Sequence, residues 1–154
     1  LFESNLYNIL HSEKNRHSET FFFKVDEYDY RVSFDKFSKD DRYFAFGFKA
    51  KHQDSDYYDF DILTNKNVFR VMQTMADIIE KFYNKNKNET IETLRKFNVD
   101  EDKWKLLFKG FIFSLRSKDK KKNEQRLMLY KRYLKKYNFS IRENETIYYI
   151  ESLD

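Results

Sequence analysis

The chain has 154 residues and a net charge of +4, from 30 basic and 26 acidic side chains. This length favours one domain, and aromatic residues make up 19% of the chain against 40% for all hydrophobic residues. Two glycines, no proline and no cysteine exclude collagen-like chains, glycine-rich phosphate loops, disulfides and zinc sites built from thiolates. No uncharged apolar run is long enough to predict a transmembrane helix.

The first part of the chain predicts one helix and then four strands. Apolar residues at helical intervals in 1–10 indicate a short helix, and the polar stretch 11–19 indicates a loop. Apolar residues then alternate with polar ones, which predicts strands over 21–25, 28–35, 43–50 and 58–62. Short polar connections between them predict an antiparallel meander.

Helical spacing returns in the second part. It predicts an amphipathic helix over 67–84, a polar break at 84–88, and a second helix over 91–97 that Asn88 caps. Residues 100–108 are either a short helix carrying Trp104 or an irregular connection. A buried strand follows over 111–115, then a basic helix lined by four apolar or aromatic residues, and finally strands over 139–141 and 147–150. The four residues lining that helix are Leu127, Tyr130, Leu134 and Tyr137.

This order of elements predicts an α+β fold with a mixed, mostly antiparallel sheet and packed helices. Residues 1–154 contain no repeat and no linker, so we expect a single domain.

The last predicted helix resembles the corresponding helix of the GNAT superfamily of N-acetyltransferases. Asn123 is followed by Leu129-Tyr130 at close to the spacing that this family shows, and Tyr137-Asn138-Phe139 is similar to its exit into a strand. The motifs that resemble the family lie in the second half of the chain. The order of predicted strands and helices resembles that of the family over most of the chain. It implies a single GNAT-like domain.

The resemblance also implies roles for particular residues. In the family, the matching tyrosine is the general acid that protonates the departing thiolate of coenzyme A, and the matching asparagine holds the cofactor. Here these roles fall on Tyr130 and Asn123. Lys66 and Asn67 precede the central helix, where the family holds the cofactor pyrophosphate. The alternative to a catalytic role is that Tyr130 is a core residue of the helix.

Two departures from the family pattern favour a protein without activity. The turn from Thr64 to Arg70 contains no glycine, although glycine lets backbone amides approach a phosphate closely. Only Asp26 and Glu27 separate the strands over 21–25 and 28–35, where the family has helices. We therefore expect a non-catalytic GNAT-like binding domain with no cofactor. An N-acyltransferase that uses acetyl-CoA is the alternative.

Lysines gather just before the last helix, at Lys118, Lys120, Lys121 and Lys122. Cations at a helix N-terminus are unfavourable unless an anion joins them. If the family topology holds, Lys66 lies at the same edge of the sheet. One hypothesis is that this edge binds a phosphate or an acidic partner; the other is a solvated lysine loop.

The remaining expectations concern partners and location. We expect a protein partner and no metal site, because the histidines and aspartates lack metal-ligand spacing. A nucleic acid is a second alternative, because Arg126, Lys131, Arg132, Lys135 and Lys136 predict a basic helical face. No membrane binding is expected. Residues 1–10 lack signal-peptide features, so we expect an intracellular protein. A looser resemblance to small uncharacterised bacteriophage proteins, at Thr64-Asn65, Arg70-Val71 and residues 126–130, implies a viral origin and the host cytoplasm.

Overall fold

The computed structural model describes residues 6–59 and 67–154. Within these residues, seven strands form one open sheet in the order β1-β2-β3-β4-β5-β7-β6, and only the β4–β5 pair is parallel. The strands are β1 (His11–Lys14), β2 (Ser18–Val25), β3 (Tyr28–Lys36), β4 (Tyr43–His52), β5 (Gly110–Phe113), β6 (Phe139–Asn144) and β7 (Ile147–Ser152). The predicted α+β class with a mostly antiparallel sheet is confirmed.

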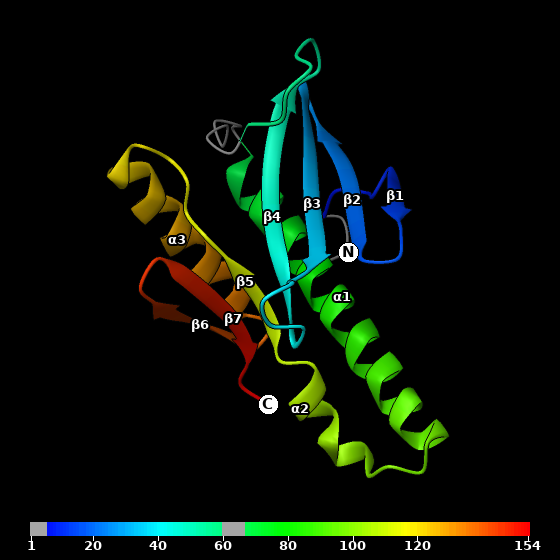
Figure 1. Cartoon of the computed structure of the whole chain (residues 1–154). Coiled ribbons are helices and arrows are strands. Elements are labelled where there is room, and N and C mark those ends of the chain that lie inside the picture. Colours follow the sequence, from blue (N-terminus) through cyan, green and yellow to red (C-terminus); the bar gives the residue numbers. More distant parts are fainter. Residues whose placement is uncertain (1–5, 60–66) are drawn as a thin grey trace.

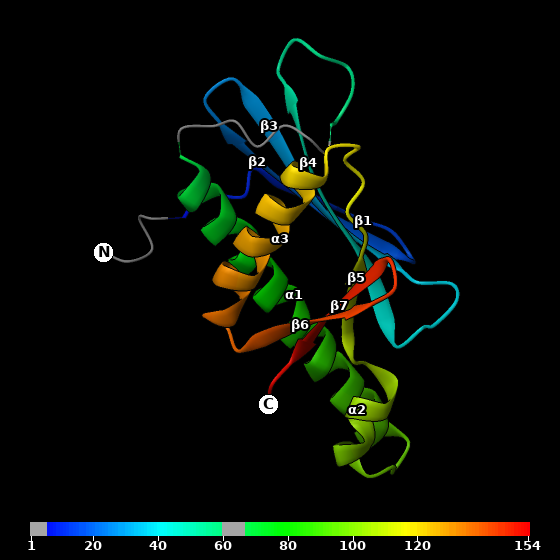
Figure 2. The same cartoon turned by 90° about the vertical axis from the view of Figure 1, so that its left-hand side faces the viewer.

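The helices are α1 (Val68–Lys96), a 3-10 turn η2 (Glu101–Lys103), α2 (Trp104–Leu107) and α3 (Lys120–Lys135). In both views α1 and α3 lie on the same side of the sheet, and no described helix covers the other side (Figures 1 and 2). The inner face of the sheet is therefore the face that packs on α1 and α3, and the outer face is open.

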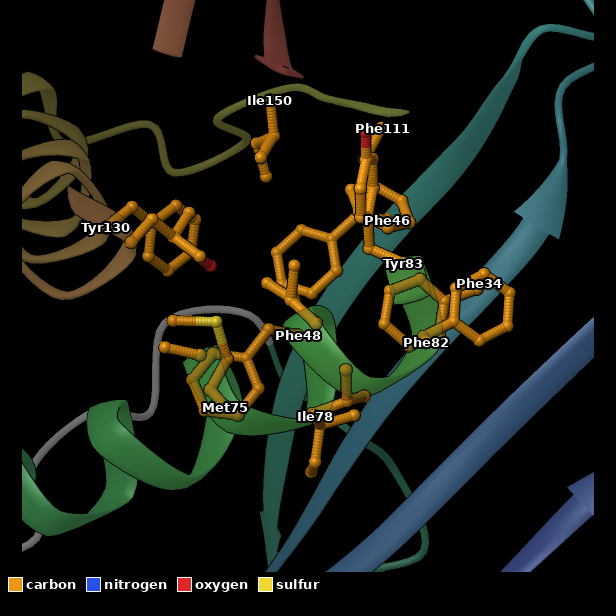
Figure 3. Close-up of a cluster of buried hydrophobic side chains, with 14 of the residues drawn as sticks. Phe34, Phe46, Phe48, Met75, Ile78, Phe82, Tyr83, Phe111, Tyr130 and Ile150 are labelled. Carbon is orange, nitrogen blue, oxygen red and sulfur yellow. The ribbon is translucent and has the colours of Figure 1, made fainter. Parts of the chain in front are cut away.

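Aromatic side chains fill the space between the helices and the inner face. Phe34 of β3 stacks on Phe82 of α1, with ring centroids 4.0 Å apart, and lies 5.3 Å from Phe111 of β5 (Figure 3). Phe34 and Phe111 are fully buried. The alternation in β3 and β4 places these rings inward, as predicted, because every second side chain of a strand points to the same face.

The predicted helix is wrong in its described part, residues 6–10, and the predicted loop over 11–19 is limited to residues 15–17. Residues 6–10 are not helical, and 1–5 lie outside the described residues. His11–Lys14 forms the edge strand β1 instead of a loop, because Asn15 accepts hydrogen bonds from the amides of His17 and Ser18 and closes a tight hairpin onto β2. All four side chains of β1 are exposed, so this edge strand carries no hydrophobic alternation that sequence reading could detect.

The predicted break at 84–88 is also wrong, because α1 continues through it to Lys96. The side chain of Asn86 donates to the carbonyl of Phe82, and the hydroxyl of Thr90 donates to the carbonyl of Asn86. Ile91 and Leu94 pack on the core in the last turns, so a separate helix capped by Asn88 does not form. Without glycine or proline, a polar run alone does not end a helix.

Residues 101–107 are helical and bury Trp104, which decides between the two alternatives for that stretch. Of the strand expected over 58–62, the described residues show one bridge, between Asp59 and Ala50, and residues 60–62 lie outside the described part of the chain.

Candidate functional site

The strands β4 and β5 run together only briefly and then diverge. Their pairing covers Tyr43 to Ala45, whereas β4 continues to His52 (Figure 1). A cleft of about 390 Å³ opens where they separate. We call it the β4–β5 cleft. Its lining comes from β3, β4, the end of β5 and the segment after it, together with Tyr130 and Ile147.

Tyr130 reaches this cleft from α3 and is almost completely buried, with 2% of its surface exposed. Its ring meets those of Phe46 and Phe113 edge to face, at centroid distances of 5.9 and 5.2 Å. Figure 3 shows its ring extending from α3 toward the aromatic cluster of β4. Tyr130 is therefore a core residue, as one of the two interpretations predicts, and it also lines the cleft.

Arg126 holds the hydroxyl of Tyr130. Its Nε donates to Tyr130 Oη at 2.7 Å, and its Nη2 donates to the carbonyl of Phe48 on β4. Arg126 as a whole is only 4% exposed, and it lies one turn before Tyr130 on the same side of α3. Burial raises the pKa of Tyr130, and the nearby charge of Arg126 opposes that rise. The phenol therefore stays protonated at neutral pH.

Tyr130→Phe is expected to lower the free energy of unfolding by about 1.5–3 kcal/mol, because it removes the acceptor of a charged, buried donor. Urea denaturation followed by circular dichroism measures the change. Tyr149→Phe is the matched control: its side chain is half-buried and its hydroxyl makes no hydrogen bond to another described residue, so the loss is about 0.5 kcal/mol or less. Equal losses would show that the Arg126 contact adds nothing to stability.

Asn123 does not reach the cleft. Its side chain accepts a hydrogen bond from the amide of Ser117 at 3.1 Å and donates to the carbonyl of the same residue at 2.9 Å. This reciprocal pair fixes the loop between β5 and α3. Both ends of the amide are thus engaged within the chain, and the side chain positions the loop.

The four lysines predicted to bind an anion are all exposed. Asp119 stands among them as the N-cap of α3, and its carboxylate accepts from the amide of Lys121 at 2.9 Å. The carboxylate of Asp119 therefore already supplies negative charge at the N-terminus of α3, where negative charge is stabilising.

Asn67 is the exposed N-cap residue of α1, and Lys66 lies outside the described residues. The first turns of α1 pack on the far end of α3, where Phe69 lies against Tyr133. Tyr133 follows Lys120 by a helix rise of about 20 Å. The structure therefore does not bring Asn67 into contact with the lysines at the start of α3.

The predicted basic face of α3 is divided. Arg126 points inward to the cleft, whereas Lys131, Arg132, Lys135 and Lys136 are exposed. Arg132 and Lys136 lie over the ring of Tyr133, at 5.9 and 4.8 Å from its centroid. Four exposed cations of the predicted face therefore remain, three of them on α3 and Lys136 at its C-cap.

The described part of the chain contains no group of three or more histidine, aspartate or glutamate side chains placed to hold a metal ion. Within the same residues, no helix combines the length and the apolar composition that crossing a bilayer requires. Comparison with protein-family models, curated proteins and solved structures found no match to this chain.

Proposed function

We propose that this chain is a non-catalytic domain with a GNAT-like fold, and that the β4–β5 cleft binds a segment of a protein partner. The order of its strands and helices supports the fold, because a meander, a central helix, a strand, a last helix and two strands follow one another as in the resemblance. A viral origin, implied by the looser resemblance, remains part of this proposal.

The observation that carries the proposal is the contact between Arg126 and Tyr130. A general acid must transfer its proton to a ligand within hydrogen-bond reach. Tyr130 is almost completely buried, which limits the access of a ligand to its hydroxyl, and Arg126, which donates to that hydroxyl, spans from α3 to the carbonyl of Phe48 on β4. This arrangement uses the tyrosine to join α3 to β4, beside a cleft that is open to a ligand.

A selection from an unbiased library of displayed 12-residue peptides tests the proposal. Selected peptides should bind the protein and lose at least tenfold in affinity for Ala45→Tyr, which fills the cleft from the outer face of β4. Thermal unfolding of Ala45→Tyr serves as the folding control. Peptides that bind both proteins equally would contradict a binding site in the cleft.

One observation favours the alternative, an N-acyltransferase that uses acetyl-CoA. Tyr130 lines the cleft, and because its oxygen accepts from Arg126, its own proton remains to be donated. Calorimetric titration with acetyl-CoA decides between the two. The proposal predicts no detectable binding at acetyl-CoA concentrations up to about 1 mM, so that any binding free energy is weaker than about −4 kcal/mol. Micromolar binding that persists in Tyr130→Phe while acetyl transfer falls would replace it with the alternative.

A further inference from the structure

The rim of the β4–β5 cleft carries cations that form no salt bridge within the described residues, and the guanidinium of Arg31 lies over the ring of Tyr58, 4.4 Å from its centroid. Arg31 on β3 lies directly opposite Lys49 on β4, and Arg116 follows the end of β5. Within residues 6–59 and 67–154, none of these three has a carboxylate oxygen within 4.0 Å. Like charges directly opposite across a strand pair are destabilising. An anionic group between Arg31 and Lys49 would remove this repulsion.

The floor of the cleft is made of small side chains on the outer face. Gly47 is paired with Ser33, and Ala45 is the next outward residue on β4. A Cβ added at Gly47 would come within 2.7 Å of the Ser33 hydroxyl, so glycine keeps this floor low. A polypeptide backbone can approach a strand closely where no long side chain intervenes.

Apolar side chains complete the lining. Phe37 follows β3, Ile112 belongs to β5 and Ile147 begins β7. The cleft thus offers both cations and apolar side chains beside a floor of small residues. An extended peptide points its side chains to alternate sides and can present acidic and apolar groups to such a lining.

The carboxylate of Asp35 distinguishes between two kinds of anionic ligand. It is exposed on β3 beside the same cleft. A nucleic acid carries a negative charge at every nucleotide and would be repelled by it. An acidic peptide places its charges at chosen positions and can present a polar or apolar residue there.

We propose that the β4–β5 cleft binds an extended acidic segment of the partner protein. Its carboxylates pair with Arg31, Lys49 and Arg116, and its apolar side chains pack on Phe37 and Ile147. The inference rests on the proposed function, because it names the chemistry of the segment that occupies the cleft. Because the pairs form at a partly exposed rim, binding weakens as salt rises.

Fluorescence anisotropy with three labelled 12-residue peptides tests this inference. The peptides alternate valine with glutamate, serine or lysine. The glutamate peptide should bind at least tenfold more tightly than the serine peptide at 50 mM salt, and the lysine peptide should bind most weakly. Arg31→Glu and Lys49→Glu should each weaken the glutamate peptide at least tenfold. Lys131→Glu, an equal charge change on the exposed face of α3, should leave it within twofold.

The outcomes separate the inference from the proposed function. If the serine and glutamate peptides bind equally and Ala45→Tyr abolishes both, the cleft is a peptide site and the acidic preference is overturned. If no peptide binds, or if all bind Ala45→Tyr as well as the unmodified protein, both proposals fail. A 12-nucleotide single-stranded DNA that binds more tightly than the glutamate peptide and depends on Arg31 would overturn the choice of a peptide.

Discussion

Gly110→Ala is expected to lower the free energy of unfolding by about 4 kcal/mol or more, enough to prevent stable folding. Gly110 has φ +143°, a conformation that side chains rarely adopt, and a Cβ there would lie 2.1 Å from the carbonyl oxygen of Ile150. That oxygen belongs to the backbone of β7, which pairs with both β5 and β6. Relief of the clash would separate β5 from β7.

Urea unfolding followed by circular dichroism measures this loss, and Gly47→Ala is the matched control. Its Cβ meets only the Ser33 hydroxyl, at the end of a side chain that can rotate away. Its cost is therefore about 1 kcal/mol or less. Similar stabilities for the two variants would mean that β5 and β7 do not approach as closely as the structure has them.

Phe34→Ala is expected to lower the free energy of unfolding by about 3–5 kcal/mol, the usual cost of removing a buried ring. Phe34 is fully buried and joins the sheet to α1 through its stack on Phe82. Differential scanning calorimetry measures the loss. Phe22→Ala, a half-buried ring on the outer face of β2, is the control and should cost less than half as much. A loss of stability for Phe22→Ala comparable to that for Phe34→Ala would contradict the placement of the core on the inner face of the sheet.

Alternation and helical spacing were enough to predict β3, β4, α3 and the final hairpin, because each buries one face and its apolar period records that burial. The strand β5 is buried on both faces, and its continuous apolar run was enough to predict it. The same reasoning failed where no face is buried, as in the exposed strand β1. It also failed at residues 84–88. This stretch is polar and was therefore predicted to end the helix, but tertiary contacts of α1 stabilise the helix through it. There the buried Leu94 and the pair between Lys85 and Glu19 support α1 beyond the predicted break.

Tyr130 could be singled out from its spacing to Asn123, whereas its hydrogen bond to Arg126 was not predicted. The pattern of basic residues assigns Arg126 to a basic helical face, although Arg126 precedes Tyr130 by four residues and Leu134 by eight. That spacing puts all three on one side of α3 and could have revealed the buried arginine. The β4–β5 cleft could not be predicted this way, because it depends on where a parallel strand distant in sequence diverges from β4.

The central claim is that the β4–β5 cleft takes a polypeptide segment and not acetyl-CoA. The chain contains only two glycines, so selective labelling with 15N-glycine gives two amide signals, one from Gly47 in the cleft floor and one from Gly110 outside it. Titration with the glutamate–valine peptide should shift the Gly47 signal until it saturates and leave the Gly110 signal unchanged. Acetyl-CoA at about 1 mM, the dissociation constant that corresponds to a binding free energy of about −4 kcal/mol, should shift neither signal. A saturable shift of Gly47 with acetyl-CoA, and none with the peptide, would contradict the claim.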